Sequence, residues 1–307
     1  MSRIAVLLSA YNGERYIEQQ IESIQGQAGI DSLTIIVRND GSQDGTLNIL
    51  QQMQGTYRNL EVIEGRNIGL AASFLELLAY AYERGYDYYS FSDQDDYWLP
   101  EKLSVAVNAL EGRESPCMYA ACSKIVDAEL AESGEVTQTD VRGITFCNSA
   151  IQNFCPGHNQ VLNRAMAKMV VSKTKYSSAI YSQDLWITNV AAVTGTIIFD
   201  NTPHTLYRQH ADNQLCFGKN RFEWVKDRVK RLRKGEGKKM AAQLKYFVEC
   251  YGAFLTEEQK AEIDSFFNAQ GSFLKRARYA AHTKLYRQRS YETSMFKIIY
   301  LLGGYHV

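Results

Sequence analysis

Short apolar runs alternate with amphipathic stretches in the first part of the chain. Four apolar runs have the length of a buried strand and cover residues 4–8, 33–37, 60–63 and 88–91. Between them, apolar residues recur at helical spacing over residues 16–25, 46–54 and 70–83. This alternation predicts an α/β fold with a mostly parallel, doubly wound sheet. Because ligands of such sheets bind at the carboxyl ends of strands, the loops after these runs are the first candidates for a site.

The pattern is less regular in the middle of the chain and purely helical at its end. We expect helices over 100–111, 166–171 and 185–193, strands over 118–126, 196–199 and 205–207, and irregular structure over 129–143 and 148–163. Beyond Phe217, helices are predicted over 222–232, over 240–255, from the capping-box spacing at Thr256 onward, and over 272–289, before a short apolar end at 298–302. We therefore predict one domain over residues 1–218 and a helical C-terminal region over 219–307.

The loop after the fourth strand carries three carboxylates within four residues, Asp93, Asp95 and Asp96. Carboxylates crowded at the end of a buried strand repel one another and lose hydration, and a divalent cation compensates for both effects. Hard oxygen ligands of this kind suit Mg²⁺ or Mn²⁺. The stretch therefore predicts a site where a metal ion meets a diphosphate. An acidic turn that caps the following helix is the alternative.

Cysteine spacing and the apolar runs indicate the compartment. The six cysteines form neither a C-x-x-C pair nor a zinc-type pattern, so free thiols in a reducing compartment are expected. The sequence enters a strand directly after its first residues, which argues against a signal peptide. No apolar run approaches the roughly 18 residues that a transmembrane helix needs. We therefore expect a cytoplasmic protein.

The formal net charge of zero hides a difference between the two parts of the chain. Residues 1–215 carry 15 Lys and Arg against 25 Asp and Glu, whereas residues 216–307 carry 19 against 9. A basic C-terminal region predicts contact with something anionic. It is interpreted either as peripheral attachment to a membrane or as a solvated face that packs on the acidic domain. Nucleic acid is disfavoured, because no recognition motif accompanies the charge.

The polar loops form a combination that is more specific than any single loop. It comprises Ser9-x-Tyr11-Asn12, Asn39-Asp40-Gly41-Ser42-x-Asp44-Gly45-Thr46, Arg66-Asn67-Ile68-Gly69 and Asp93-Gln94-Asp95-Asp96. Over about residues 3–218 the chain resembles the inverting nucleotide-sugar transferases of glycosyltransferase family 2, which have the Rossmann-like GT-A fold. The run Tyr207-Arg208-Gln209-His210-x-x-Asn213 and the form Ser-Asp-Gln-Asp-Asp-x-Trp look most like rhamnosyltransferase-type members, which act on bacterial surface polysaccharides.

The resemblance implies donor-binding roles in all four loops. Tyr11 would stack on a pyrimidine base, and Asp40 would accept the N3–H hydrogen bond of uracil or thymine. Asp93 would contact the ribose or the donor sugar. Asp95 and His210 would bind a Mn²⁺ or Mg²⁺ ion at the diphosphate, although His210 also suits a structural role. The other implied donor contacts are Ser9, Asn12, Arg66, Asn67, Gly69 and Gln94.

The resemblance also implies a catalytic base and an acceptor site. Asp184, in Gln183-Asp184-x-Trp186, matches the family's base, which takes the proton of the acceptor hydroxyl as that oxygen attacks the anomeric carbon. One displacement then inverts that carbon. An N-cap is the alternative for Asp184. Acceptor contacts are expected at Trp98, Gly157, His158 and Trp186. For the two tryptophans, core packing is the alternative.

The leading hypothesis is therefore a metal-dependent inverting glycosyltransferase that adds one sugar to a bacterial surface glycan. The signature Gln-x-x-Arg-Trp of processive synthases is absent from the sequence, which favours single additions. The expected donor is dTDP-rhamnose, or else a UDP-hexose or UDP-N-acetylhexosamine, and the acceptor is expected to be lipid-linked. A homodimer through the C-terminal region is a further expectation. The alternatives are a sugar nucleotidyltransferase, disfavoured because the loop at residues 9–13 is not a triphosphate loop, and a non-catalytic binding protein.

Overall fold

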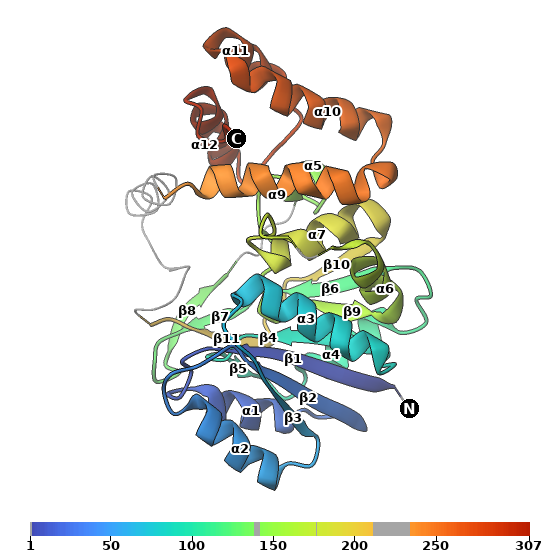
Figure 1. Cartoon of the computed structure of the whole chain (residues 1–307), viewed down its shortest axis with the longest axis vertical. Helices are drawn as coiled ribbons and strands as arrows, with labels where there is room; N and C mark the ends of the chain where they lie inside the picture. Colours follow the sequence, from blue (N-terminus) through green and yellow to red (C-terminus); the bar gives the residue numbers. More distant parts are fainter. Residues whose placement is uncertain (1, 138–141, 176, 211–233) are drawn as a thin grey trace.

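A seven-stranded sheet forms the centre of the computed structural model, which describes residues 2–137, 142–175, 177–210 and 234–307 (Figure 1). The strand order is β10-β6-β9-β4-β1-β2-β3. The first four strands pair in parallel, as predicted, and β9 runs antiparallel to both of its neighbours. The strands are β1 (Arg3–Ala10), β2 (Ser32–Asn39), β3 (Leu60–Glu64), β4 (Tyr88–Ser92), β6 (Cys117–Ala121), β9 (Val161–Asn163) and β10 (Thr196–Asp200).

Helices cover both faces of this sheet because successive side chains of each strand point to opposite sides. In β1, Val6 and Leu8 pack in one core cluster, whereas Ala5 and Leu7 pack in the other. The first cluster joins the sheet to α1 (Ile17–Gln25), α2 (Thr46–Thr56) and α4 (Lys102–Leu110). The second joins it to α3 (Leu70–Glu83), α6 (Arg164–Lys173) and α7 (Gln183–Thr194). The doubly wound arrangement expected from the sequence is confirmed.

A second sheet of four short strands corrects two sequence predictions. Its order is β5 (Tyr97–Trp98), β11 (Thr205–Arg208), β7 (Lys124–Val126) and β8 (Glu132–Val136). The run 118–126, predicted as one strand, is divided between β6 and β7, which belong to different sheets. The strand β8 lies in a stretch predicted to be a loop. Every residue of β8 is exposed, so the strand has no apolar pattern from which it could be predicted.

The rest of the middle region is built from short elements. α5 (Phe146–Ser149) and the 3₁₀ helix η1 (Gly157–Asn159) precede β9, so the stretch predicted to be irregular is partly ordered. None of the five described cysteines forms a disulfide, whereas Cys216 lies outside the described residues. In the described parts of the chain, no helix has both the length and the apolar character that crossing a membrane requires.

Within residues 234–307, the described part of the C-terminal region, the α-helices are α9 (Glu236–Tyr251), α10 (Glu257–Asn268), α11 (Phe273–His282) and α12 (Ser290–Leu301). The capping box at Thr256 is confirmed at the start of α10. Within the predicted segment 272–289, the helix α11 ends already at His282. The apolar run 298–302 is the end of α12. The predicted helix 222–232 and the predicted domain boundary after residue 218 lie outside the described residues.

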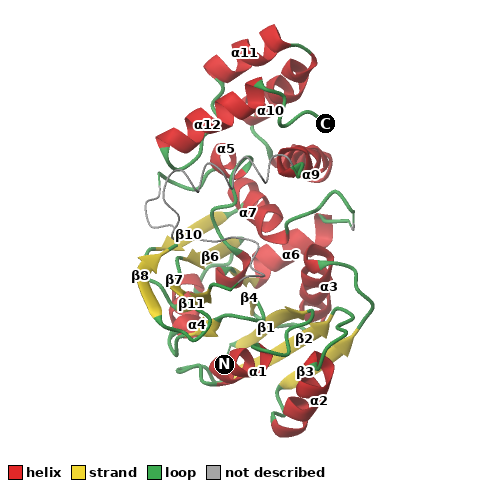
Figure 2. Ribbon diagram, turned by 90° about the vertical axis from the view of Figure 1, so that its left-hand side faces the viewer, coloured by secondary structure: helices red, strands yellow, loops and turns green. Residues whose placement is uncertain are grey.

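Trp186 joins the C-terminal helices to the sheet domain. Its indole ring stacks on Tyr246 of α9 with ring centroids 5.6 Å apart, and it makes edge contacts with Phe247 and Tyr251. Its Nε1 donates to Thr174 Oγ1 at 2.9 Å. Figures 1 and 2 both place α9 between α7 and α10. The C-terminal region therefore packs on the sheet domain through α9, and its residues 286–292 also hydrogen-bond to residues 142–152 of that domain.

Candidate active site

The loops after β1 and β2 are locked together by hydrogen bonds. Asn12, which has a positive φ of 49°, donates its backbone N–H to Ser42 Oγ at 3.0 Å and accepts from the backbone N–H of Gln43 at 2.8 Å. Gly13 donates its N–H to Thr46 Oγ1 at 2.8 Å. Asn12 therefore shapes the loop that carries Tyr11, through both its backbone N–H and its side-chain oxygen.

Gln94 fixes the backbone of Tyr11 and leaves the Tyr11 ring exposed. The Gln94 side chain accepts from the Tyr11 N–H at 2.9 Å and donates to the Tyr11 carbonyl at 3.1 Å. A Cβ on Gly13 would lie 2.4 Å from Gln94 Oε1, so glycine at this position leaves room for the amide. The acidic loop and the first loop are thus one unit, with an aromatic ring on its surface.

Asp40, at the end of β2, is buried and holds the loop that begins α3. Its carboxylate accepts from the backbone N–H groups of Ile68 at 2.9 Å and Gly69 at 3.0 Å. Arg38 forms a buried ion pair with Asp40 and donates to the Arg66 carbonyl at 3.1 Å. Through these contacts, Asp40 and Arg38 fix the position of the Arg66–Gly69 turn. Gly69 has a φ of +86°, which favours glycine.

Three of the other predicted donor residues in these loops differ in their burial. Ser9 is buried, and its hydroxyl donates to Ser73 Oγ of α3 at 2.7 Å, so it ties β1 to α3. The side chains of Arg66 and Asn67 are exposed beside the loop that Asp40 holds. The structure therefore brings Tyr11, Asp40 and the Arg66–Gly69 turn to the carboxyl ends of β1 and β2, where the sequence pattern placed them.

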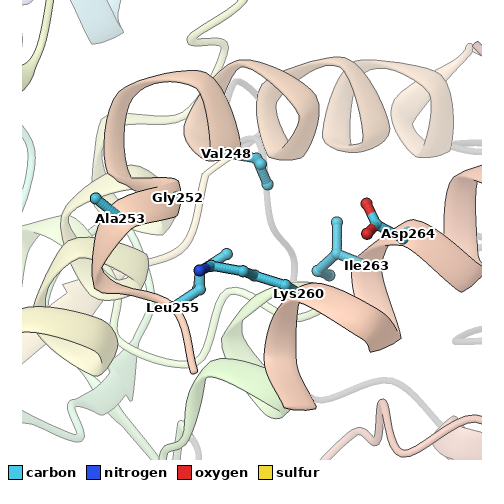
Figure 3. Close-up of a pocket in the computed structure, with 7 residues that line it drawn as sticks. All are labelled: Val248, Gly252, Ala253, Leu255, Lys260, Ile263 and Asp264. Carbon is cyan, nitrogen blue, oxygen red and sulfur yellow. The ribbon is translucent and has the colours of Figure 1, made fainter. Parts of the chain in front are cut away.

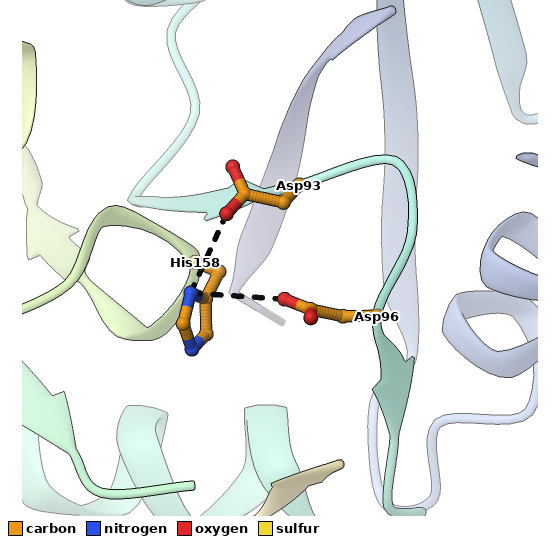
Figure 4. Close-up of side chains that lie close together, drawn as sticks. All are labelled: Asp93, Asp96 and His158. Carbon is orange, nitrogen blue, oxygen red and sulfur yellow. Dashed lines mark ion pairs between the residues drawn. The ribbon is translucent and has the colours of Figure 1, made fainter. Parts of the chain in front are cut away.

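The acidic loop between β4 and β5 contains two groups of candidate metal ligands. In the first, Asp95 Oδ2 lies 2.8 Å from His210 Nε2, so the pair predicted from the sequence is brought together. Burial and the negative charge of Asp93 raise the pKa of Asp95. The second group consists of Asp93, Asp96 and His158, whose ligand atoms all lie within 4.8 Å of one another (Figure 4).

The second group was not predicted as a set. His158 Nδ1 lies 3.4 Å from Asp93 Oδ2 and 3.7 Å from Asp96 Oδ2. Burial by itself lowers the pKa of His158, but the neighbouring Asp96 and Asp93 outweigh it and raise that pKa. The ring stacks on Tyr207 with centroids 5.1 Å apart. His158, expected at the acceptor, is buried in the acidic cluster instead.

Asp96 is the most deeply buried of the three carboxylates. It is 0% exposed, and neither of its oxygens has a hydrogen-bond partner among the described residues. Burial raises the pKa of Asp96 to about 7. Buried carboxylate oxygens without donors, beside further carboxylates and an imidazole, are a donor set that fits a divalent cation. The surroundings of the acidic loop therefore suit the Mn²⁺ or Mg²⁺ ion that the sequence predicted.

Lys102, at the start of α4, connects the acidic cluster to two other segments. Its Nζ donates to the His158 carbonyl at 2.5 Å, to Asn159 Oδ1 at 3.2 Å and to Thr205 Oγ1 at 2.8 Å. The ammonium also lies 3.8 Å from the centroid of the Trp98 ring. Burial lowers the pKa of Lys102 to about 7. One side chain thus holds η1 and β11, the strand that leads to His210, against α4.

Asp184 lies in the first turn of α7, and Ser182 occupies the N-cap position. Asp184 Oδ1 accepts from the backbone N–H of Leu185 at 2.8 Å and from the Ser182 hydroxyl, and Oδ2 accepts from Asn153 Nδ2 at 2.5 Å. Asp184 is therefore not the N-cap residue. Its carboxylate is held by donors on both oxygens, which fixes its orientation.

The segment 157–160 contacts both Asp184 and the acidic cluster. A Cβ on Gly157 would lie 3.4 Å from Asp184 Cβ, and Gln160 Nε2 donates to the Asp184 carbonyl at 2.9 Å. The Gln160 carbonyl accepts from the N–H of Phe91 in β4 at 3.1 Å. His158, within the same segment, pairs with Asp93 and Asp96. A carboxylate base and a metal-type cluster are thus held on two sides of one short segment.

The two tryptophans predicted to contact the acceptor lie in the core. Trp98 is 1% exposed and Trp186 is 0% exposed, so neither ring presents a surface to a sugar. The acceptor role is wrong for both in this structure, and the alternative of core packing is correct. A protein core and a sugar-binding surface both favour tryptophan for its large apolar area, so the residue type does not distinguish the two roles.

A pocket of ≈ 430 Å³ lies elsewhere, between α9 and α10 (Figure 3). Val248, Leu255 and Ile263 form its apolar part, and Lys260 and Asp264 lie at its edge. Its lining contains none of the residues predicted for a site. The chemistry of the acidic loop and Asp184 is therefore separate from this pocket.

Comparison with known proteins agrees with this geometry. The chain belongs to glycosyl transferase family 2, whose family model matches residues 5–167. It is 27% identical over 216 residues to the dTDP-rhamnosyl transferase RfbG of Shigella flexneri, a match that covers 68% of this chain and 73% of RfbG. The resemblance to rhamnosyltransferase-type members of this family is therefore confirmed, and the protein is a glycosyltransferase of the bacterial polysaccharide type.

Solved structures establish the fold. The structure of S. aureus TarS residues 1–349 with UDP-GlcNAc matches with a TM-score of 0.60 at 16% identity, covering 99% of this chain and 89% of that one. The mannosyltransferase PcManGT of Pyrobaculum calidifontis, in complex with GDP-Man and Mn²⁺, matches with a TM-score of 0.50 at 15% identity, covering 98% and 85%. The expected GT-A fold with a helical C-terminal region is confirmed.

Proposed function

We propose that this protein is an inverting, metal-dependent glycosyltransferase that moves one sugar from a nucleotide diphosphate sugar to a hydroxyl of a bacterial surface glycan. The observation that carries the proposal is the segment 157–160: Gly157 lies close to the Asp184 side chain, Gln160 donates to the Asp184 backbone carbonyl, and His158 pairs with the acidic cluster. An attacking hydroxyl and a departing diphosphate need a base and a positive counter-charge on opposite sides of the anomeric carbon. This segment adjoins residues suited to both tasks.

In the proposed reaction, Asp184 accepts the proton of the acceptor hydroxyl. Its two oxygens are oriented by the donors Leu185, Ser182 and Asn153, so the carboxylate needs little reorganisation before it acts. A Mn²⁺ or Mg²⁺ ion, when bound, supplies positive charge that offsets the negative charge of the leaving diphosphate. Asp95 and His210 would hold it, and the charge of Asp93 acts on the Asp95 carboxylate.

The nucleotide would lie over the carboxyl ends of β1 and β2. The exposed ring of Tyr11 offers a stacking surface for a pyrimidine. Asp40 Oδ1 accepts from Arg38 and Ile68, whereas Oδ2 accepts from Gly69, so Oδ2 has capacity left for a base N–H. The name of RfbG favours dTDP-rhamnose as the donor. The UDP-GlcNAc bound to TarS favours a UDP-N-acetylhexosamine as the second candidate.

The proposal extends to the setting of the reaction. The glycan acceptor would be lipid-linked, and the enzyme would act in the cytoplasm, with peripheral contact to the membrane through its C-terminal region. A homodimer through that region remains a proposal as well. Gly157 would border the acceptor, because it adjoins Asp184.

The proposal is tested by measuring donor hydrolysis and sugar transfer with dTDP-rhamnose and with UDP-N-acetylglucosamine. We expect turnover with Mn²⁺, loss of turnover with EDTA, and an inverted anomeric centre in the product by NMR. Metal-independent turnover would overturn the metal requirement, and a product of retained configuration would overturn the single displacement.

A variant of Asp95 tests the metal site itself. Asp95→Ala removes the carboxylate that contacts His210, so we expect Mn²⁺ to lose its effect on the affinity for dTDP or UDP, measured by calorimetry. The matched control is Asp127→Ala, which changes a loop carboxylate that accepts from nearby backbone N–H groups. Nucleotide affinity that still rises with Mn²⁺ in Asp95→Ala would remove Asp95 as a ligand.

A further inference from the structure

The start of α11 and the end of α12 expose large apolar side chains to solvent. On α11, Phe273 is 57% exposed and Leu274 is 80% exposed. On α12 and directly after it, Ile298 is 57% exposed and Leu302 is 76% exposed. Residues 298 and 302 are four apart, so they lie on the same side of the helical turn. We call these four residues the apolar tip.

The two halves of the apolar tip are joined by Arg276. Its Nε donates to the Leu301 carbonyl at 2.9 Å, and its Nη1 donates to the Gln270 carbonyl at 2.8 Å. The first bond holds the first turn of α11 against the last turn of α12, and the second joins α11 to the turn that precedes it. The turn that carries Phe273 and Leu274 therefore lies beside the end of α12, which carries Ile298. Figure 1 shows α10 to α12 at the end of the long axis that is opposite α1 and α2.

The chain around the apolar tip is strongly basic. Residues 272–307 contain seven Lys and Arg but a single acidic residue, Glu292. Glu292 is buried, where it pairs with Arg287 and accepts from Gln152. Lys275 and Arg278, by contrast, are exposed next to Phe273 and Leu274. Lys284 pairs with Glu258 of α10, so Lys275 and Arg278 supply the positive charge beside Phe273 and Leu274.

We infer that the apolar tip docks on an anionic lipid bilayer. Exposed Phe, Leu and Ile side chains enter the boundary between headgroups and acyl chains, and adjacent Lys and Arg side chains neutralise lipid phosphates. A contact between two copies of the tip would instead bring like charges together, which opposes association. The inference rests on the proposed function, gives its membrane contact a defined surface, and places that contact on α11 and α12.

The test uses the full chain and vesicles in a sedimentation assay. Wild-type protein is mixed with vesicles of phosphatidylethanolamine and phosphatidylglycerol, or with vesicles of phosphatidylcholine alone. We expect binding to the anionic vesicles, weaker binding at high salt, and little binding to phosphatidylcholine. Equal binding to both kinds of vesicle, or to neither, would overturn the inference.

Three variants separate the tip from the rest of the molecule. Leu274→Ser with Leu302→Ser should lower partitioning onto anionic vesicles by about tenfold or more. Lys275→Gln with Arg278→Gln should lower it and weaken its dependence on salt. Phe254→Ser, a matched control at an exposed aromatic residue of η2 (Gly252–Phe254), should bind like wild type. Tip variants that bind like wild type would overturn the inference.

Two further measurements distinguish the alternatives. Light scattering reports the oligomeric state, and a dimer that the Leu274→Ser and Leu302→Ser changes dissociate would assign the tip to a second copy instead. Metal-supported donor hydrolysis needs no membrane, so the tip variants should retain wild-type hydrolysis rates. Loss of vesicle binding with hydrolysis intact supports the inference. Intact vesicle binding in a chain without hydrolysis would leave the inference standing and overturn the proposed reaction.

Discussion

Asp184 differs from an ordinary surface carboxylate in that donors reach both of its oxygens. Asp184→Asn keeps the shape of the side chain but removes its ability to accept a proton. We therefore expect donor affinity close to that of wild type and a fall in the rate of transfer by about 10²- to 10⁴-fold, the usual contribution of a general base. Calorimetry with the nucleotide sugar and a transfer assay measure the two quantities separately.

The control for this variant is Asn153→Ala, which removes one donor to Asp184 Oδ2 and leaves the carboxylate in place. It should reduce transfer less than Asp184→Asn does. If the Asp184→Asn variant transfers sugar at the wild-type rate, another residue is the base.

Lys102 acts as a joint between α4, η1 and β11, and Lys102→Met tests that role. Methionine fills a similar volume but makes none of the three hydrogen bonds of the ammonium. We expect kcat for transfer to fall by about 10²-fold, because small misplacements of reacting groups are costly, while the donor KM changes little. Steady-state kinetics, with circular dichroism to measure the folded fraction, check this expectation.

Two other variants make the test of Lys102 specific. Thr205→Val removes one acceptor of the ammonium and should show a smaller fall in kcat of the same kind. Lys124→Met removes a lysine at the surface that pairs with Glu132, and it should leave kinetics unchanged. A fall in activity that only follows the folded fraction would assign Lys102 a purely structural role.

At the residue scale, the sequence predicts which residues lie at the site better than it predicts what each side chain contacts. It pairs Asp95 with His210, and the two side chains do meet although they lie far apart in the chain. It places His158 at the acceptor, because the residues around His158 in the sequence give no sign that η1 packs against β4. The position of Lys102 on the apolar side of α4 could be inferred from the sequence. Lys102 shares a helix face with Ala106, which is fully buried.

At the scale of elements, η1 and the residues after it connect the two halves of the site, and Gly157→Ala tests that connection. A Cβ at this position would lie 3.0 Å from Gln183 Nε2 and 3.4 Å from Asp184 Cβ, so the start of α7 would have to shift. We expect transfer to fall by about tenfold through displacement of the base. Nucleotide affinity should be unchanged, because the base-binding loops are not touched.

The matched control is Gly55→Ala in α2, where an added Cβ meets nothing within 4 Å. It should leave transfer intact and stabilise the helix slightly. Equal losses in the two variants would show that position 157 has no special relation to Asp184.

The elements that the sequence predicts correctly have either a continuous apolar run, such as the buried residues 4–8 of β1, or one buried and one solvated side. The helix α3 is an example, because Phe74, Leu77 and Leu78 recur at helical spacing and are all buried. The strand β8 has no buried residue, so no pattern marks it. The run 118–126 is largely apolar, but apolar character does not reveal that the chain changes sheets at residues 122–123, between the end of β6 and the start of β7.

At the scale of the whole molecule, Trp186 decides how the C-terminal helices relate to the sheet domain. The sequence indicates a change from α/β to helical pattern, but it shows no sign that the two parts share a core. In the structure, one core cluster contains Leu7 of β1 as well as Phe247 of α9. A contact between distant segments leaves no local periodicity, so the sequence around Trp186 is equally consistent with an acceptor site.

This shared core predicts that the described parts of the chain unfold together. Trp186→Ala removes a fully buried ring that contacts Tyr246, Phe247 and Tyr251 of α9, so we expect a loss of about 3–5 kcal/mol in the free energy of unfolding. Urea titration followed by circular dichroism measures it, and Leu302→Ala at an exposed site should change it by no more than about 0.5 kcal/mol. Because both α9 and residues 286–292 are bound to the sheet domain, wild-type protein should show one transition. Two separate transitions, with the first unaffected by Trp186→Ala, would mean that the helices only rest on the sheet domain.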